Sequence, residues 1–442
     1  MENTSHNVAT ERDQHPMKND PTNAGRNNLR LGIKLSIILA ISLLLLIPQA
    51  IIMNVVDERA STEQNADLEV SEKWGTGQTL TGPVLFIPGD SAKNNIYILP
   101  ETLDIDGDIS SRTLRRGIYD FTVYESTLTL AGRFVLPKEL KAHQLHHLRT
   151  GQAKLLFAIS DFKGFADNPS LQLGGQRADL TAEDLALGSD NALSCSVDLQ
   201  QLLSGGTVDY RLTVPIKGSN YLYFLPVGRT TSVQLRSDCA TPSFTGRYLP
   251  ADREVTDQGF AAQWKVLALN RDFAQVFNSH TALRNAQSFG VDLKVPVMQY
   301  QQTTRSIKYA YLIILLTFAV VFFVEIRRQT PIHPVQYALV GIALMLFYTL
   351  LLSFSEHLSF LLSYLIASVM TIGLITLFMR ALLHSTRPAL FVALLLTVLY
   401  LFIYIIMQLE SYALLVGSLG LFAILAAAMY ASRKINWYQK PL

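Results

Sequence analysis

The sequence predicts an α+β membrane protein with six transmembrane helices, one near the N-terminus and five near the C-terminus, and a large β-rich domain inserted between helices 1 and 2. Apolar segments of about 20 residues, the length that a helix needs to cross a bilayer, recur along the chain. Residues 331–430 contain only four charged side chains. Short runs rich in β-branched and aromatic residues separate the first apolar segment from the second.

The first transmembrane helix is expected within residues 29–56, where 33–53 reads IKLSIILAISLLLLIPQAIIM. This stretch is longer than the apolar region of a signal peptide and lacks a small-residue cleavage site, so a retained anchor is predicted. Residues 1–28 are polar and unpatterned, and a disordered tail is expected there. Residues 56–73 carry good helix formers, which predicts that the helix continues outward until Gly75 and Gly77.

Five further helices form the expected bundle at 306–430, at about 309–326, 335–354, 358–379, 389–407 and 412–430, followed by a tail at 431–442. Orientation follows from Lys and Arg in short loops. Arg26, Arg30 and Lys34 precede helix 1. Further Lys and Arg separate helices 2 and 3 and helices 4 and 5 and follow helix 6, whereas 355–357 and 408–411 contain none. This pattern predicts a bacterial inner membrane protein with both termini cytoplasmic and residues 57–305 periplasmic.

The periplasmic segment 57–305 has 28 Asp and Glu against 24 Lys and Arg. Strands are predicted at 121–124, 127–130, 208–214, 221–225, 231–235 and 263–269, with turns at Asp106-Gly107, 204–206 and 217–220. Many short strands in succession favour an antiparallel, sandwich-like domain. A helix is expected at 137–148, where Pro137 precedes good helix formers.

Composition also limits the ligands. The net charge of +2 gives no bulk attraction to nucleic acid, so no nucleic-acid partner is expected. The sequence contains no nucleophile elbow, P-loop or dinucleotide fingerprint, and no cofactor is predicted. His143 and His147 have a spacing that can bind zinc on one helix face, with His146 beside them, but the catalytic Glu of an HExxH motif is missing. A solvated histidine face is therefore expected, and no metal.

The two cysteines, Cys195 and Cys239, exclude a disulfide scaffold. Both fall in the periplasmic segment, where disulfides persist, so a single structural bond between them is left open.

The membrane part offers the candidate functional residues. Ser353, Ser355, Glu356 and His357 form a tight polar turn between helices 3 and 4, and Glu410 lies in the turn between helices 5 and 6. Such a cluster could respond to protons or contact a ligand. The alternative is a polar turn that satisfies helix-end backbone groups. Glu325 is interpreted as an interfacial charge paired with a neighbour, since Arg327 and Arg328 follow it.

Several strings resemble the CreD family, also called the Cet-type inner membrane proteins of Gram-negative bacteria. The similarity runs from about residue 28 to 440. It is carried by WGTGQTLTGPVL at 74–85, LRRGIY at 114–119, SFTGRYLP at 243–250, HPVQYALVG at 333–341, LLLSFSEH at 350–357 and ASRKINWY at 431–438. The chain departs from the family pattern at 87–89, where no aromatic follows Pro88, and at Asp120, where Glu is expected.

The resemblance implies an envelope-integrity protein, switched on by the CreBC two-component system and linked to colicin tolerance and the β-lactam response. Together with the polar turns at Glu356, His357 and Glu410, this leaves three functions to consider. The first is a non-enzymatic envelope protein whose periplasmic domain binds a partner or cell-wall component, and this one is preferred. The second is a transporter or flippase-like bundle. The third is a membrane enzyme acting on lipid or peptidoglycan precursors with Glu356 and His357 as acid and base. The oligomeric state and the partner are not determined by sequence.

Overall fold

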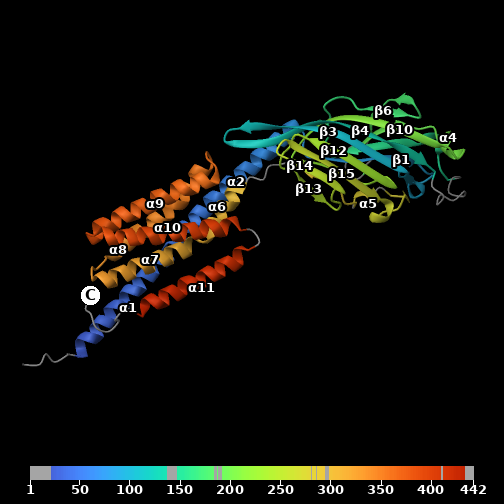
Figure 1. Cartoon of the computed structure of the whole chain (residues 1–442). Helices are drawn as coiled ribbons and strands as arrows, with labels where there is room; N and C mark the ends of the chain where they lie inside the picture. The colour runs from blue at the N-terminus through green and yellow to red at the C-terminus, as the bar shows by residue number, and fades with distance from the viewer. Residues whose placement is uncertain are drawn as a thin grey trace, which may run out of the picture. The chain divides into compact units, whose positions relative to one another are not determined.

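The computed structural model describes residues 21–136, 147–183, 187, 192–279, 281–284, 286–293, 298–409 and 412–433. The chain divides into two compact units. The membrane unit comprises Met1–Arg59 and Met298–Leu442, and the β unit comprises Ala60–Val297. Figure 1 shows the helices of the first unit and the strands of the second.

The membrane unit is helical, as expected. Among the described residues, five helical stretches are long and apolar enough to cross a membrane, and α11 carries a shorter apolar stretch, Leu415–Ala427. The helices are α1 Pro21–Leu44, α2 Leu46–Trp74, α6 Met298–Lys308, α7 Ala310–Arg328, α8 Pro334–Ser355, α9 Phe360–Leu383, α10 Thr386–Gln408 and α11 Ala413–Ser432. Leu, Ile and Phe side chains of α7–α11 remain exposed on the outside of the unit, which fits a lipid-facing surface.

The N-terminal helix differs from the expected tail in one respect. Helix α1 already begins at Pro21, so residues 21–28 are helical rather than disordered. A single turn residue, Leu45, separates α1 from α2, just before Pro48, which has no N–H to donate to the preceding turn.

The predicted outward extension of the N-terminal helix is confirmed, since α2 continues to Trp74 and stops at Gly75. Gly75 has a φ of 144°, a conformation that other residues rarely adopt.

Helix α6 is an element that the hydropathy pattern did not indicate. Its sequence, MQYQQTTRSIK, is polar, yet the helix packs against α7, α8 and α10. A buried stripe at helical spacing makes this contact and consists of Tyr300, Thr303, Ser306 and Ile307. The membrane unit therefore has hydroxyl-bearing side chains in its interior.

The β unit contains two sheets. Within the described residues, the first has nine strands in the order β13-β17-β11-β1-β5-β9-β8, with β2 paired to β1 and β16 to β2. Its strands are β1 Gln78–Ile87, β2 Ile96–Ile98, β5 Lys154–Ile159, β8 Thr181–Glu183, β9 Ala192–Ser196, β11 Tyr221–Phe224, β13 Ser243–Gly246, β16 Val276–Phe277 and β17 Phe289–Asp292.

The second sheet, again counted over the described part, has eight strands in the order β14-β15-β12-β3-β4-β10-β6-β7. They are β3 Thr102–Arg116, β4 Tyr119–Val135, β6 Ser170–Leu173, β7 Gln176–Ala178, β10 Thr207–Ser219, β12 Thr230–Ser237, β14 Asp252–Thr256 and β15 Gly259–Leu267. Short helices connect the strands at Ala92–Asn94, Thr150–Gln152, Phe162–Gly164, α4 Gln200–Leu203, Ala268–Asn270 and α5 Thr281–Arg284.

The sheets are mixed, and this corrects the antiparallel prediction. Most neighbouring strands run antiparallel, but β1 pairs with β11 in parallel and β12 pairs with β3 in parallel. Both parallel pairs join strands that are distant in the chain. Local alternation indicates that a segment is a strand but carries no information about the direction of its neighbour.

One hydrophobic core joins the two sheets. Every second residue of β3 is buried from Leu103 to Ile109, as half-buried strands require. Trp264 of β15 lies with its ring centre 6.0 Å from that of Phe289 of β17, which belongs to the other sheet. Both side chains are buried, so this contact is part of the sandwich interior.

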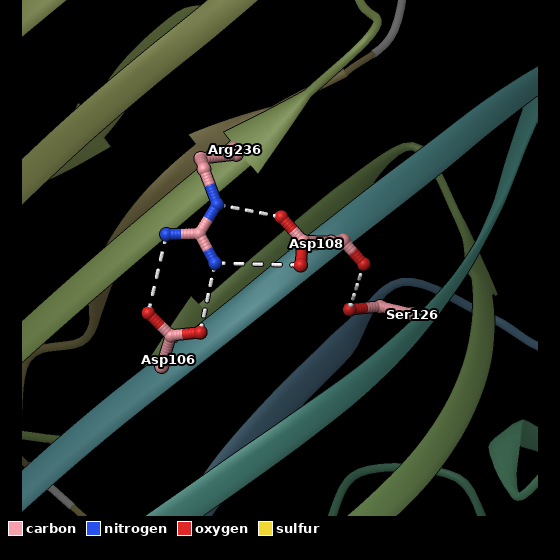
Figure 2. Close-up of polar contacts among 4 residues, drawn as sticks. All are labelled: Asp106, Asp108, Ser126 and Arg236. Atoms are coloured by element: carbon pink, nitrogen blue, oxygen red, sulfur yellow. Dashed lines mark hydrogen bonds and ion pairs between the residues drawn. The ribbon is translucent and has the colours of Figure 1, made fainter.

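The predicted turn at Asp106-Gly107 is wrong, because both residues lie inside β3. Figure 2 shows what these positions do instead. The Arg236 guanidinium of β12 donates to Asp106 at 2.9 Å and to Asp108 at 2.6 Å, and Ser126 Oγ donates to the Asp108 carbonyl at 2.8 Å. Arg236 lowers the pKa of the Asp108 carboxyl by this hydrogen bond. The aspartate that suggested a turn from the local sequence therefore lies within β3 and helps to join that strand to β12.

The cysteines are not joined in the structure. Cys195 in β9 and Cys239, which follows β12, are both free and buried, so the disulfide left open by the sequence is not formed.

Of the predicted 137–148 helix, residues 137–146, with His143 and His146, lie outside the described residues. His147 is exposed, and its Nδ1 lies 3.1 Å from an Asp90 carboxylate oxygen.

Candidate functional site

The polar turn predicted between the third and fourth spans joins α8 to α9. Ser355 is buried and its Oγ donates to the Leu352 carbonyl at 2.9 Å, which satisfies the end of its own helix. Ser353 and His357 are exposed. Glu356 caps α8, and its backbone N–H reaches the Leu352 carbonyl. The backbone-capping interpretation describes this turn better than a convergent cluster. Glu410 lies outside the described residues.

Glu356 does have a charged partner, but not the adjacent imidazole. Arg59 of α2 places its Nε 3.6 Å from the Glu356 carboxylate. The Glu356 side chain is 13% exposed and that of Arg59 is 50% exposed. Screening by solvent keeps a pair of this kind weak. The contact nevertheless joins α2 to the α8–α9 turn. It also pairs with Arg59 the Glu356 carboxylate that was predicted as the acid or base of a membrane enzyme.

Among the described residues of the membrane unit, the most buried charged side chain is that of Glu325, near the end of α7. Its exposed fraction is 0%. Lys34 of α1 forms an ion pair with Oε1, the Ile332 backbone N–H donates to the same oxygen at 3.0 Å, and the Tyr337 hydroxyl donates to Oε2 at 2.7 Å. Removing an ionised carboxylate from water is costly unless it is paired and hydrogen-bonded. Both oxygens of Glu325 meet that condition.

The local sequence explains how these groups converge. Helix α7 ends at Gln329, which adopts the left-handed conformation with a φ of 56° and donates its N–H to the Glu325 carbonyl at 2.8 Å. His333 then begins α8 as an N-cap, followed by Pro334 at the first helical position. This tight connection of five residues, 329–333, turns the chain back, so Ile332 and Tyr337 lie over Glu325.

Sequence reasoning placed Glu325 with a neighbouring arginine and treated Lys34 only as a loop charge that sets orientation. The structure pairs the two instead. A usable signal was present, since Lys34 and Glu325 lie at the cytoplasmic ends predicted for their spans and are ionisable residues within them. The sequence does not indicate that these two residues pair with each other, because a contact between different helices leaves no periodic pattern in the sequence.

The β unit anchors the end of α2 with polar contacts. Arg116 of β3 pairs with Glu69 at 2.8 Å, and Lys73 pairs with the same carboxylate at 2.7 Å. Hydrogen bonds from these two cations lower the pKa of Glu69 to about 2. The guanidinium of Arg112 lies 4.3 Å from the centre of the Trp74 ring. These contacts hold the 60–74 part of α2 against the β3–β4 hairpin.

A shallow depression lies where β13 and β14, the edge strands of the two sheets, meet. It is lined by Pro242, Ser243, Phe244, Arg253 and Val255. The Arg253 guanidinium lies 5.7 Å from the centre of the Phe244 ring, and the Val255 side chain is 48% exposed. The depression thus offers apolar surface, a cation and two strand edges. Within the described residues, no group of three or more His, Cys, Asp or Glu could hold a metal ion.

Comparison with known proteins shows similarity over almost the whole chain. Residues 30–438 match the family described as inner membrane protein CreD. The chain is 30% identical over 413 residues to the inner membrane protein CreD of Escherichia coli strain K12, covering 90% of this chain and 91% of that protein.

Solved structures give weaker likenesses. The M1 zinc metallopeptidase of Deinococcus radiodurans is 12% identical with a TM-score of 0.22, over 44% of this chain and 42% of that one. Yeast LTA4 hydrolase is 9% identical with a TM-score of 0.19, over 51% of this chain and 35% of that one. TM-scores this low carry no argument about fold or activity.

Proposed function

Because the chain belongs to the CreD family of inner membrane proteins, we propose that it is a non-enzymatic protein that supports cell envelope integrity and the stress response. Its β unit would bind an envelope protein or a cell-wall component, and its membrane unit would anchor that unit in the bilayer.

The observation that carries the proposal is the state of the membrane carboxylates. Glu325 has both oxygens engaged by Lys34, Tyr337 and the Ile332 N–H. Glu356 faces Arg59, while His357 is exposed. A general acid or base needs a free oxygen or ring nitrogen directed at a substrate. Carboxylates that hold helices together support anchoring rather than catalysis.

The depression between β13 and β14 is the surface that best suits a partner. Exposed strand edges can receive an added strand, while Val255 and Arg253 add apolar and charged contact. A photoreactive amino acid at Ser243 or Val255, both exposed, should give a discrete crosslinked adduct in living cells. Exposed Gln176 on β7, at the far edge of the second sheet, is the matched control. Equal adducts at all three positions, or none, would count against this surface.

The proposed topology has both termini in the cytoplasm and residues 57–305 in the periplasm. The cationic ends of α7 and α9 support it, since Arg327, Arg328 and Arg380 lie at one end of the bundle while the 356–359 turn at the other end has no Lys or Arg. A cytoplasmic fluorescent reporter fused after Arg433 should be active. An active periplasmic phosphatase fused at that position would reverse the assignment.

A transporter or flippase-like bundle is the second candidate. The buried hydroxyl groups on α6, including Thr303 and Ser306, favour it, because polar interiors are typical of substrate paths. Two substitutions, Glu356→Gln and His357→Ala, distinguish the transporter candidate from the anchoring proposal. Under the anchoring proposal both variants retain full β-lactam and colicin responses. Loss of those responses in well-inserted variants would favour transport, or the membrane enzyme that uses this acid and imidazole.

A further inference from the structure

Two phenol groups deep in the membrane unit have no hydrogen-bond partner among the described residues. They belong to Tyr348 of α8 and Tyr400 of α10, which are 1% and 2% exposed. A hydroxyl removed from water without a compensating hydrogen bond is costly, and more so in a lipid environment. Buried polar groups are therefore satisfied in most proteins, and two that lack a partner among the described residues indicate a bound ligand.

The two tyrosines share one aromatic cluster. The ring centre of Phe347 lies 4.9 Å from that of Tyr348 and 4.6 Å from that of Tyr400. Tyr364 of α9 completes the cluster at 5.4 Å from Phe347, and its hydroxyl donates to the Tyr400 carbonyl at 2.8 Å. The partner of the Tyr364 hydroxyl is thus known. The Tyr348 and Tyr400 hydroxyls have no such partner among the described residues.

The surroundings of this cluster carry little charge. All three tyrosines lie in the half of their helix nearest the 356–359 turn. Helix α6 packs against α8 and α10, and Ser306 on its buried stripe also has no partner for its Oγ in the described part of the chain. Glu325, the fully buried carboxylate, lies near the opposite end of its helix pair. The interior here suits a neutral ligand, because a charged one would need a buried counter-ion.

We propose that Tyr348 and Tyr400 form a binding site for a neutral hydroxyl-bearing ligand. One phenol donates a hydrogen bond to the ligand oxygen, and the other accepts one from its O–H, which a phenol can do in either direction. Two sources supply this chemistry in a membrane: a water molecule and the hydroxyl of a lipid headgroup. The site lies in the membrane unit and does not depend on the function proposed for the β unit.

The first test is a double-mutant cycle on the purified full chain in phospholipid nanodiscs. Tyr348→Phe and Tyr400→Phe should each lower the thermal unfolding midpoint by roughly 2–4 °C. The double variant should lose little more than either single one, because both hydroxyls contact the same ligand. Tyr412→Phe, at a side chain that is 65% exposed, is the control and should not change the midpoint. If the hydroxyls have no ligand, the Phe variants will unfold at or above the wild-type temperature.

The second test reads the hydrogen bonds directly and identifies their source. Ultraviolet resonance Raman difference spectra, wild type minus each Phe variant, report whether that phenol is hydrogen-bonded. They are recorded in nanodiscs of phosphatidylcholine alone, whose headgroup has no hydroxyl, and in nanodiscs of phosphatidylcholine with added diacylglycerol, whose headgroup is one uncharged hydroxyl. Hydrogen-bonded phenols in both kinds of nanodisc identify water, and hydrogen bonding only where diacylglycerol is present identifies the lipid hydroxyl. Free phenols in both kinds of nanodisc would overturn the proposal.

Discussion

Lys34 and Glu325 stand 291 positions apart in the sequence, and their side chains form an ion pair inside the membrane unit. The pair joins α1 to α7, while Tyr337 adds α8 to the same carboxylate. A buried pair of this kind contributes little net stability over an apolar replacement, but it fixes which helices are neighbours. We regard it as the contact that sets the position of the N-terminal helix in the bundle.

Removal of one member of the Lys34–Glu325 pair should therefore destabilise the folded membrane unit. Lys34→Met leaves the Glu325 carboxylate buried without a counter-ion and should lower the free energy of unfolding by about 3 kcal/mol. Lys34→Met combined with Glu325→Gln should be more stable than Lys34→Met alone, because no unpaired charge remains. Thermal unfolding of the detergent-solubilised chain measures both.

Arg59→Met is the matched control for this cycle. It removes a cation from Glu356, but from a pair at 3.6 Å in which Arg59 is half exposed, so the expected cost is below about 1 kcal/mol. Equal losses for Lys34→Met and Arg59→Met would show that burial of Glu325 has no special role.

The Arg116–Glu69 pair predicts a pH dependence. The folded pKa of Glu69, about 2, lies below its ordinary value of 4.5, so its contribution to stability is present above pH 4.5 and is lost as the pH falls through about 2. Arg116→Gln removes the larger cause of the shift. The difference in unfolding midpoint between wild type and variant should be constant from pH 7 to 5 and shrink from pH 4 to 2. A difference in unfolding midpoint that grows toward low pH would contradict the expectation that the Glu69 carboxylate stabilises the fold only when it is ionised.

The free thiols predict a labelling pattern. Cys195 is 5% exposed, and burial raises its pKa to about 11, so almost no thiolate exists at pH 8. N-ethylmaleimide should leave Cys195 and the buried Cys239 unmodified in the folded chain, and should modify both after denaturation without a reductant. Labelling of the denatured chain only after reduction would instead reveal the disulfide, and intact mass spectrometry distinguishes the two results.

Gly132 predicts a packing defect in the second sheet. A Cβ at this position in β4 would lie 1.9 Å from the Thr102 carbonyl oxygen and 2.6 Å from the Tyr210 hydroxyl. Gly132→Ala should lower the free energy of unfolding by about 1–3 kcal/mol because backbone and ring must move apart. Gly151→Ala, which meets nothing within 4 Å, should change it by less than about 0.5 kcal/mol. Near-ultraviolet circular dichroism of the full chain during heating follows both.

The predicted polar cluster illustrates the limits of sequence reasoning. Glu356 and His357 are adjacent in the chain, and adjacency suggested a joint site. On the α8–α9 turn, however, Glu356 caps a helix and faces Arg59, while His357 is exposed. The phenols of Tyr348 and Tyr400, which have no partner in the described part of the chain, were not predicted, because a tyrosine in an apolar span gives no indication of where its hydroxyl will lie.

The sequence by itself determined the N-terminal span, four of the five predicted C-terminal spans, the strand-rich segment between them and the point where α2 ends at Trp74. Each of these depends on local properties: the length of an apolar run, alternation along a strand, and the backbone freedom of Gly75. Only the tertiary structure decided that β12 runs parallel to β3, that Arg236 bridges Asp106 and Asp108, and that Lys34 pairs with Glu325. Those contacts join residues far apart in the chain, and which of them form depends on the packing of whole elements.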